Sequence, residues 1–348
     1  MKILLTGGAG FIGMHVARSL MAKSHEVVII DNLNDYYSPQ LKLDRLGQLG
    51  IKCSDESSTS VSTSYPKLSF IKGDIVEKQL VFDTFECFRP QIVINLAAQA
   101  GVRYSLENPD TYVQSNVVGF LNLLEAARKY PVQHFVFASS SSVYGLNGKL
   151  PYSTHDNVSH PVSLYAATKI ADEMMAHTYS HLFKIPCTGL RFFTVYGPWG
   201  RPDMSPYLFA DAISSDKPLK VYNYGKMRRD FTYIDDIVEG IINVVKRPPS
   251  NNPSWNSQVA DCATSSAPYV IYNIGNTYSV NLIDYIAAFE TAFGKKANKE
   301  FLPLQLGDVL ETFSDMEDMK RDFSFSPKVN VCEGVKRYVE WFRNYYGR

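Results

Sequence analysis

The stretch from Lys2 to Ala22 constrains the fold of this chain more than any other part of the sequence. Lys2–Thr6 reads as a short apolar strand, and the glycines that follow have the spacing Gly7-x-x-Gly10-x-x-Gly13. A helical pattern then continues to the end of the stretch. Glycines let the backbone turn tightly and approach a pyrophosphate, whose charge is met by N–H groups at the helix N-terminus. The stretch therefore predicts a strand–loop–helix unit that binds a dinucleotide.

A second apolar run, Glu26–Ile30, leads to Asp31, which stands 18 residues after Gly13. A carboxylate at this strand end can accept both ribose hydroxyls of NAD, and it repels the 2′-phosphate of NADP. Strand, loop, helix, second strand and terminal acid occur in order, so the sequence predicts NAD as the cofactor. We expect it to be bound by Gly7, Gly10, Phe11, Ile12, Gly13, Asp31, Asn32, Asn34, Asp74, Ile75, Leu96, Ala97, Ala98, Gln99, Asn116, Tyr165, Lys169 and Phe193.

Apolar runs continue to alternate with amphipathic stretches through the first half of the chain. Short continuous runs of this kind indicate strands buried on both faces, as in a parallel sheet. The predicted strands are Lys2–Thr6, Glu26–Ile30, Leu68–Ile71, Ile92–Leu96, His134–Ala138 and Cys187–Arg191. Within Asn116–Tyr130, the residues Val117, Phe120, Leu121 and Leu124 share one face of a predicted helix. The alternation predicts an α/β fold, a Rossmann-type doubly wound parallel sheet.

The alternation loosens after about Thr194, where Pro, Gly and aromatic residues cluster. We expect residues 1–193 to form mainly the NAD-binding Rossmann domain. Residues 194–348 are expected to form mainly a smaller C-terminal substrate-binding subdomain, with segments that return to the first domain. The polar stretches Cys53–Pro66 and Pro248–Pro268 are expected to be surface excursions, mobile rather than structured.

The composition excludes several classes of protein. With 35 basic and 35 acidic side chains, the chain lacks the positive charge with which a nucleic-acid binder neutralises phosphates. Its five cysteines form no CxxC pair and no metal-ligand spacing, so we expect no metal site and free thiols in a reducing cytoplasm. No apolar run reaches the roughly 20 residues that span a bilayer. We therefore expect a soluble cytoplasmic enzyme or binder with no nucleic-acid or membrane partner.

Tyr165 and Lys169 lie four residues apart, on one face of a helix predicted over Tyr165–Phe183. A nearby ammonium favours the phenolate, as does the positive nicotinamide ring of NAD⁺. The phenol, whose ordinary pKa is about 10, can then act as a base near neutral pH. The serines Ser139–Ser142 follow the strand His134–Ala138, so one of their hydroxyls can relay a substrate proton to Tyr165. An isolated pair of this kind is common in helices, and the cofactor motif is what favours a catalytic role here.

Longer motifs occur along nearly the whole chain. They are Asp31–Tyr37 (DNLNDYY), Ala98–Ser105 (AQAGVRYS), Ser163–Lys169 (SLYAATK), Leu190–Met204 (LRFFTVYGPWGRPDM) and Lys226–Tyr233 (KMRRDFTY). The sequence resembles the extended short-chain dehydrogenase/reductase superfamily and, within it, the nucleotide-sugar epimerases. It is most similar to the UDP-glucuronate 4-epimerases.

The resemblance implies roles for individual residues. It implies Tyr165 as the catalytic base, Lys169 as its partner and Ser140 as the hydroxyl relay. Thr194 and Arg201 would handle the uronate end of the substrate. Arg229 and Asp308 would grip the UDP diphosphate and ribose, although Arg229 also fits a surface charge beside Asp230. The complete set of expected substrate contacts is Arg103, Ser141, Ser142, Thr194, Arg201, Tyr222, Arg229, Gln305 and Asp308.

The implied reaction converts UDP-glucuronate to UDP-galacturonate with NAD bound throughout. Tyr165 takes the C4 hydroxyl proton through Ser140 while C4 gives hydride to NAD⁺. The 4-keto sugar then rotates, and the hydride stored on bound NADH returns to the opposite face. A 4-keto uronate is a β-keto acid that loses CO₂ easily. We therefore expect Arg201 and Thr194 to hold its carboxylate so that the breaking bond is not aligned with the ketone π-system.

Other functions remain open. Related 4,6-dehydratases carry an Asp-Glu pair in place of Ser141 and Ser142, and related uronate decarboxylases carry a glutamate in place of Ser142. Serine is too weakly acidic to replace these carboxylates, so both are minor alternatives. A 4-epimerase of UDP-glucose or UDP-N-acetylglucosamine is a closer alternative. A non-catalytic NAD-sensing protein is another, and the tyrosine–lysine pair argues against it.

The helices predicted over Asn116–Tyr130 and Tyr165–Phe183 carry more apolar and small residues than one core-facing stripe requires. The resemblance implies that such helices pair across a two-fold axis into a four-helix bundle. We therefore expect a homodimer.

Overall fold

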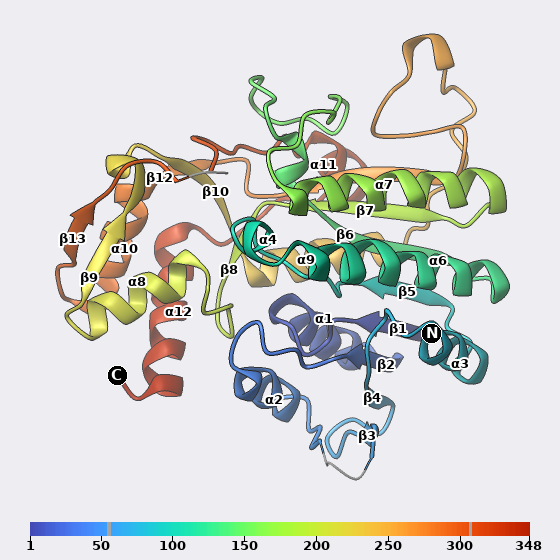
Figure 1. Cartoon of the computed structure of the whole chain (residues 1–348), viewed down its shortest axis with the longest axis horizontal. Coiled ribbons are helices and arrows are strands. Elements are labelled where there is room, and N and C mark those ends of the chain that lie inside the picture. Colours follow the sequence, from blue (N-terminus) through green and yellow to red (C-terminus); the bar gives the residue numbers. More distant parts are fainter. Residues whose placement is uncertain (54–56, 306–307) are drawn as a thin grey trace. The chain divides into compact units, whose positions relative to one another are not determined.

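The computed structural model describes residues 1–53, 57–305 and 308–348, and the chain divides into two compact units. The first unit comprises Met1–Asn147, Thr154–Arg191 and Gly240–Tyr272, and the second comprises Gly148–Ser153, Phe192–Glu239 and Asn273–Arg348. The chain therefore crosses between the units several times rather than finishing one before it begins the other (Figure 1).

An eight-stranded sheet forms the centre of the first unit, with the order β11-β7-β6-β5-β1-β2-β4-β3. The strands are β1 (Lys2–Thr6), β2 (Glu26–Asp31), β3 (Thr59–Val61), β4 (Leu68–Lys72), β5 (Ile92–Asn95), β6 (His134–Ser140), β7 (Cys187–Phe192) and β11 (Tyr269–Ile274). The pairs β1–β2, β1–β5, β2–β4 and β5–β6 are parallel. Starting from β1, the chain extends the sheet first toward β4 and then, beginning with β5, in the opposite direction. This order confirms the predicted Rossmann-type doubly wound sheet.

The six predicted strands are all present. β1 has the predicted ends, and the other five differ at their C-terminal ends by one or two residues. β2, β4 and β7 each extend one residue further, to Asp31, Lys72 and Phe192. β5 ends at Asn95, one residue early, and β6 runs on to Ser140. The extension of β6 places Ser140 as the last residue of a central strand, which fixes its backbone more firmly than a loop would.

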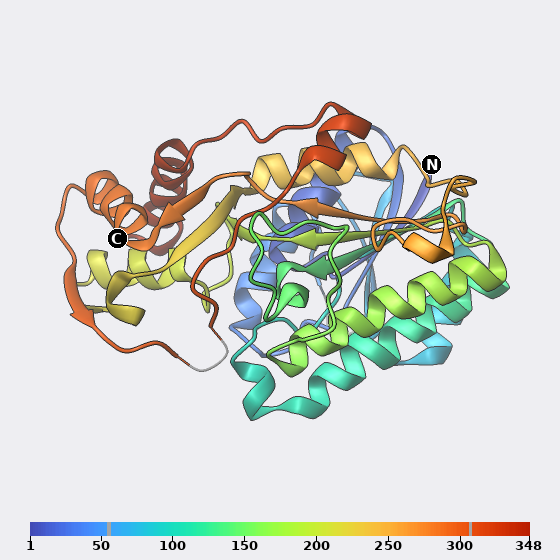
Figure 2. The ribbon, with the colours of Figure 1, turned by 90° about the horizontal axis from the view of Figure 1, so that it is seen from above.

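Helices cover both faces of this sheet. The helices of the first part of the chain are α1 (Phe11–Ala22), α2 (Pro39–Gly47), α3 (Lys78–Phe88), α4 (Tyr104–Glu107), α5 (Pro109–Tyr112), α6 (Gly119–Lys129) and α7 (Leu164–Phe183). Figure 2 shows α6 and α7 side by side along one face. Leu4 of β1 points to this face, while its neighbours Ile3 and Leu5 are equally buried. Successive strand residues point to opposite faces, so the other face is covered too.

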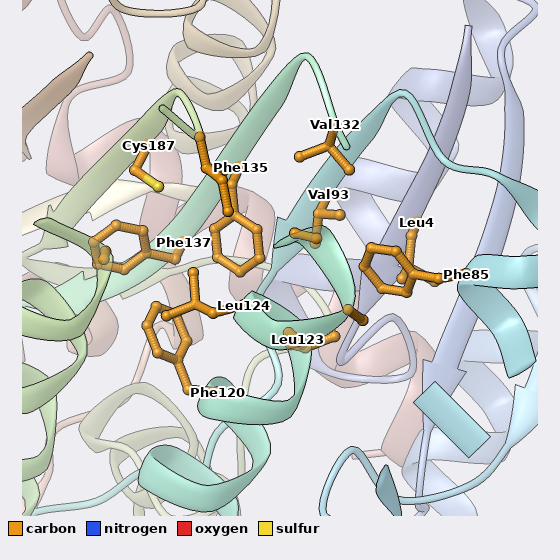
Figure 3. Packing of buried hydrophobic residues seen from close by; sticks show 14 of the residues in the cluster. Leu4, Phe85, Val93, Phe120, Leu123, Leu124, Val132, Phe135, Phe137 and Cys187 are labelled. Carbon is orange, nitrogen blue, oxygen red and sulfur yellow. The ribbon is translucent and has the colours of Figure 1, made fainter. Parts of the chain in front are cut away.

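The core between the sheet and α3, α6 and α7 is rich in aromatic rings (Figure 3). Phe120 of α6 meets Phe135 and Phe137 of β6 edge to face, with ring centroids 5.6 and 5.3 Å apart. The residues of α6 in this core are Phe120, Leu123, Leu124, Ala126 and Ala127. Leu121, which the spacing groups with Phe120 and Leu124 on one helix face, is 38% exposed, so the residues of that face are not all in the core. The helix has apolar residues on a buried face and on an exposed face, and their periodicity alone does not distinguish the two.

The start of the predicted helix Asn116–Tyr130 also differs from the prediction. A π-helical turn spans Val113–Val118, and regular α-helix begins at Gly119. Such turns insert an extra residue into the helix and re-aim its side chains. Here the turn contains the buried Asn116.

The two polar stretches are more ordered than expected. The expectation that Cys53–Pro66 lacks structure was wrong in part, because β3 pairs antiparallel with β4 and Ser62 donates to the Leu49 carbonyl at 2.6 Å. Residues 54–56 of this stretch lie outside the described residues. In Pro248–Pro268, a short 3₁₀ turn spans Ser257–Val259, and the Asp261 carboxylate accepts from Thr264 at 2.7 Å. Local polar contacts therefore shape both excursions.

The second unit contains two small sheets, ordered β12-β10-β8 and β13-β9. Its elements, with α9, which continues into the first unit, are β8 (Thr194–Tyr196), α8 (Ser205–Ser214), β9 (Pro218–Val221), β10 (Arg228–Tyr233), α9 (Ile234–Val245), β12 (Ser279–Asn281), α10 (Leu282–Phe293), β13 (Asn298–Phe301), α11 (Glu317–Phe323) and α12 (Val331–Tyr346). Stacked rings form its core: Phe231 and Tyr285 lie 3.7 Å apart, and Phe289 meets Tyr285 edge to face. Of the helices in the described part of the chain, none has the length and apolar character that crossing a membrane requires.

Candidate active site

The glycine-rich loop after β1 leaves no room for side chains. Gly7 has φ +71°, and a Cβ atom there would lie 2.7 Å from the backbone nitrogen of Ala97. A Cβ at Gly13 would clash with the Gly7 carbonyl. The loop leads into α1, with Gly10 at the N-cap and Phe11 and Ile12 in the first turn. The bare backbone at a helix N-terminus is suited to a phosphate group.

The glycine loop lies at the point where the strand order of the sheet reverses. β1 and β5 are neighbours in the sheet, and the segments that follow them lead to opposite sides of it. Thr6 donates to the Asn95 side chain at 2.5 Å and accepts from the Ala97 N–H at 3.2 Å. These bonds hold the end of β5 and the segment that follows it, with Leu96 and Ala97, against the glycine loop. Ala98 is the next residue of this segment. Predicted cofactor residues from two strands are thus brought together.

Asp31 closes the same edge of the sheet at the end of β2. Its two carboxylate oxygens accept backbone N–H bonds from Ala9 and Leu33, at 3.0 and 2.9 Å. Burial raises the pKa of this carboxyl, and the Lys42 ammonium and the two N–H donors oppose that rise. The carboxylate therefore positions the glycine loop, and its oxygens keep lone pairs that can accept hydrogen bonds from a ribose.

Asn32 and Asp74 connect the segments that follow β2 and β4. The Asn32 amide donates to the Asp74 carboxylate at 2.8 Å, and the Asn34 N–H donates back to the Asn32 oxygen at 3.0 Å. Ile75 is buried next to Asp74, and its carbonyl accepts from Asn122 of α6 at 3.0 Å. The acids and amides predicted from the ends of β2 and β4 therefore form one connected group.

Asn116 ties the loop after β5 to α7. Its oxygen accepts from the Gln99 N–H at 2.8 Å, and its amide donates to the Gln99 carbonyl and to the Thr168 hydroxyl. Gln99 and Asn116 are both nearly inaccessible to solvent. The sequence placed Asn116 at the cofactor, and the structure adds this bridging role, which depends on the π-helical turn.

Tyr165 lies in the first turn of α7. Ser163 caps that helix by accepting the Ala166 N–H at 3.1 Å. The Tyr112 ring meets Tyr165 edge to face at 6.1 Å, and the Tyr112 hydroxyl donates to the carbonyls of Ala100 and Gly101. Sequence reasoning missed Tyr112, which has no motif of its own.

Ser140 ends β6, and its hydroxyl accepts from the Ser142 N–H at 3.1 Å. Ser141 and Ser142 begin the 3₁₀ turn that follows, Ser141–Tyr144. All three serines and Tyr165 belong to the first unit. The expected relay and base thus stand at the carboxyl end of a central strand and the N-terminus of the helix that packs on it.

Lys169 is buried, with 1% of its surface exposed. Its ammonium donates to Asp172 at 3.0 Å and interacts electrostatically with the Tyr165 phenol. Burial alone would lower the pKa of this lysine, but the charge and hydrogen bond of Asp172, together with Tyr165 and Glu173, raise it. Sequence reasoning missed Asp172, although its spacing of three residues from Lys169 is a detectable signal.

Thr194 and Arg201 belong to the second unit. Thr194 begins β8 and pairs with Phe231 of β10, while the preceding Phe193 N–H donates to Ile274 at 3.1 Å. The Arg201 guanidinium donates from two nitrogens to Asp203, at 3.0 and 2.5 Å. The sequence prediction did not include this carboxylate beside Arg201.

Arg229 lies on β10, and its guanidinium donates to the carbonyls of Arg228 and Leu310 at 2.9 and 3.1 Å. The neighbouring Asp230 points the other way, into the core, where it accepts from the Ser314 hydroxyl at 2.5 Å and the Asn276 N–H at 2.7 Å. Asp230 is therefore a structural group rather than a surface charge paired with Arg229.

The remaining predicted contacts lie in turns. Tyr222 begins a 3₁₀ turn of the second unit, and Arg103 is at the N-cap of α4 in the first. The Asp308 N–H donates to the Gln305 carbonyl at 3.3 Å, while Leu306 and Gly307 of that motif lie outside the described residues. Within the described part of the chain, no three His, Cys, Asp or Glu side chains are grouped so that they could hold a metal ion.

A model of the NAD dependent epimerase/dehydratase family matches residues 3–275, which include the glycine loop, Asp31 and the Tyr165–Lys169 pair. The chain belongs to this family. NAD is its cofactor, as the sequence predicted, and the chain is an enzyme of the nucleotide-sugar epimerase group.

Individual members of the family are similar over their full length. Protein CapI of Staphylococcus aureus is 50% identical, covering 99% of each chain. A probable UDP-glucuronate 4-epimerase of Rhizobium meliloti is 43% identical over 100% of this chain and 98% of its own. The solved UDP-glucuronic acid 4-epimerase of Bacillus cereus, in complex with UDP-glucuronic acid and NAD, is 30% identical with a TM-score of 0.85, covering 99% of each chain.

Proposed function

We propose that this epimerase interconverts UDP-glucuronate and UDP-galacturonate by inverting C4 through a transient 4-keto sugar. The observation that carries the proposal is the buried Lys169 beside Tyr165, in the same unit as the glycine loop. Relatives that are named for this activity support the choice of a uronate.

The first unit would hold the cofactor. The glycines let the loop pack closely against the segment after β5 and lead into α1, whose N-terminal N–H groups would bind a pyrophosphate. The Asp31 carboxylate would accept hydrogen bonds from a ribose. NAD, when bound, supplies a two-electron acceptor and donor for the carbon that is inverted. Among the residues of this chain, Asn116 and Thr168 keep α7 at a fixed distance from the strand ends.

Tyr165 would take the C4 hydroxyl proton through Ser140 and return it after the sugar has turned. Ser140 can do this because its hydroxyl already accepts a backbone N–H, which leaves its own proton free to be directed to the phenol. The Lys169 ammonium favours the phenolate that forms. General base catalysis of this kind contributes about 10²–10⁴-fold to the rate.

The second unit would hold the UDP-sugar. Arg229, with Tyr222, Gln305 and Asp308, would bind the nucleotide, and Thr194 and Arg201 would orient the uronate carboxylate. An arginine suits both a diphosphate and a carboxylate, because its planar fork of donors can bind two oxygens at once.

A second candidate is a 4-epimerase of UDP-glucose or UDP-N-acetylglucosamine. The specific observation in its favour is the Arg201–Asp203 ion pair, since a carboxylate already engages two nitrogens of the guanidinium. A neutral hydroxymethyl group would suit a partly neutralised arginine better than a second anion would.

Parallel assays of the three UDP-sugars separate these candidates. We expect kcat/KM for UDP-glucuronate to exceed that for UDP-glucose and UDP-N-acetylglucosamine by at least about tenfold, equivalent to about 1.4 kcal/mol. A preference for either neutral sugar would transfer the proposal to the second candidate.

A further inference from the structure

Asp172 is a buried acid for which the reaction described above has no use. It lies one helical turn after Lys169 on α7, and its Oδ2 accepts from the Lys169 ammonium at 3.0 Å. No more than 2% of either side chain is exposed. The other carboxylate oxygen, Oδ1, is also buried and has no hydrogen-bond partner among the described residues.

The contacts of Asp172 give no structural reason for a carboxylate at this position. A buried carboxylate with one unpartnered oxygen costs free energy that a neutral side chain would not. The neighbouring Glu173 does have a structural function, because both of its oxygens bind Arg191 of β7 and one also accepts from Ser139 of β6. Among the described residues, Lys169 is the only hydrogen-bond and ion-pair partner of the Asp172 carboxylate.

Charged and titratable groups around Asp172 come from several elements. On α7 itself they are Lys169, Glu173 and, beyond Lys169, Tyr165. From β7, Arg191 faces Glu173 and neutralises it, and from α5, the Tyr112 ring faces Tyr165. The Lys169 ammonium is therefore the positive charge that lies between two acids, Asp172 and Tyr165.

We propose that Asp172 is a positioning residue for proton transfer: it anchors the Lys169 ammonium and, when ionised, competes with the Tyr165 phenol for that charge. The proposal rests on the proposed role of Tyr165 as the base.

Coupling of this kind makes each acid harder to ionise once the other is negative. A protonated Asp172 leaves the full charge of Lys169 to favour the phenolate, and an ionised Asp172 offsets it. Burial raises the pKa of the Asp172 carboxyl to about 7, while Lys169 opposes that rise. The charge of Asp172 therefore changes near neutral pH.

The test is a pH titration of the NAD-bound protein, followed by the ultraviolet absorption of the phenolate. Subtracting the Tyr165→Phe spectrum isolates Tyr165 from the other tyrosines. In Asp172→Asn, which keeps the size and hydrogen-bonding ability of the side chain, we expect the midpoint of Tyr165 ionisation to fall by about one pH unit. The acidic limb of the pH–rate profile should move in the same direction.

Two further variants fix the interpretation. Asp172→Ala removes the same charge without keeping the side chain, so it should produce the same downward shift even if its rate is lower. Glu125→Gln is the matched control, since Glu125 accepts from Tyr179, further along α7, at 2.5 Å. It should leave the Tyr165 midpoint unchanged.

An unchanged or raised midpoint in both folded Asp172 variants would overturn the proposal. So would a shift of equal size in Glu125→Gln. The titration contains no sugar, so its outcome is independent of the substrate. Failure to convert UDP-glucuronate would count against the proposed function while leaving the coupling between Asp172 and Tyr165 intact.

Discussion

Tyr165 depends on a small set of contacts for its orientation. The Ser163 cap fixes the helix start on which it stands, and the Tyr112 ring covers one side of it. Lys169 lies one turn further along the same face and is closed off from solvent. A phenol held in this way keeps its hydroxyl in one place through both halves of the reaction, which proton transfer in two directions requires.

Removing this hydroxyl should abolish most of the activity without emptying the cofactor site. We expect Tyr165→Phe to lower kcat by about 10²–10⁴-fold, because the proposed reaction uses this phenol to take the C4 hydroxyl proton. The NAD content of the purified variant, measured after denaturation, should equal that of the unmodified protein. A variant that epimerises at the original rate would remove the role of base from Tyr165.

Arg201 tests how the 4-keto intermediate is protected. If Arg201 and Thr194 hold the carboxylate out of alignment with the ketone, Arg201→Ala should release CO₂ and form a UDP-pentose, with NADH left on the protein. Chromatography of the products and the absorbance of reduced cofactor would detect both. An unchanged product ratio would remove this role from Arg201.

Asp203 provides the complementary change. The Asp203 carboxylate competes with the substrate carboxylate for the Arg201 guanidinium. Asp203→Asn should therefore lower KM for UDP-glucuronate several-fold and leave KM for UDP-glucose unchanged. Equal effects on both sugars would indicate a general change in the fold of this turn.

Helix α7 is joined to the sheet by a buried ion pair as well as by apolar contacts. Arg191 of β7 donates two hydrogen bonds to Glu173, at 2.9 and 2.8 Å, and neither side chain is accessible to solvent. Breaking such a pair leaves an uncompensated buried charge, which costs about 3–5 kcal/mol. The position of the base relative to the strand ends is therefore strongly fixed.

In the second unit, Glu290 links α10 to β13. Burial alone would raise its pKa, but hydrogen bonds from Lys299, Lys296 and the Ala297 N–H lower it from 4.5 to about 2. A lowered pKa means that the stabilisation is complete above pH 4.5 and is lost as the pH falls toward 2.

We therefore expect Glu290→Gln to lower the free energy of unfolding by about 1–2 kcal/mol at neutral pH, less than the full shift implies because Lys296 is exposed. Denaturant titrations should show this difference narrowing below pH 4.5. Glu239→Gln, which removes an exposed partner of Lys328, is the control, with a change of no more than about 0.5 kcal/mol. A difference that is the same at every pH would contradict the ionic origin.

The elements that sequence predicted well are those in which one local signal decides the structure. The strands from Lys2 to Cys187 were found because continuous β-branched runs have few alternatives, and the glycine loop because its spacing is stereochemically required. β3 was missed because Thr59–Val61 is polar and exists by pairing with β4. The exposure of Leu121 could not be predicted, because apolar spacing does not distinguish a buried face from an exposed apolar one.

The candidate site divides in the same way. Asp31, Ser140, Tyr165 and Lys169 follow from motif spacing, and the structure places them at strand ends and a helix start. Asp172 and Asp203 could not be assigned because their significance depends on the pairing of charged side chains, which the chain order does not show. The roles of the predicted residues in binding stay predictions.

The exposed apolar residues of α6 and α7 bear on the assembly of the molecule. These helices lie side by side (Figures 1 and 2), and their exposed apolar side chains include Leu121, Met174, Leu182 and Phe183, between 38% and 61% exposed. Several exposed apolar side chains on two neighbouring helices are typical of an interface. A second copy of the same surface, related by a two-fold axis, would cover it.

We expect the protein to sediment as a dimer at micromolar concentration and Met174→Glu to produce monomers, because a buried unpaired carboxylate would face the partner helix. Val259→Glu is the control, since Val259 is 77% exposed on a surface loop and its change should leave the dimer intact. Sedimentation of the unmodified protein as a monomer would contradict this assembly.

The proposed reaction is tested most directly with UDP-glucuronate that carries deuterium at C4, incubated with the purified protein and no added cofactor. Proton couplings in the product spectrum identify the sugar, and mass spectrometry locates the label. Transient oxidation at C4 predicts UDP-galacturonate that keeps its deuterium at C4. Loss of the label to solvent, or no conversion while UDP-glucose is converted, would contradict it.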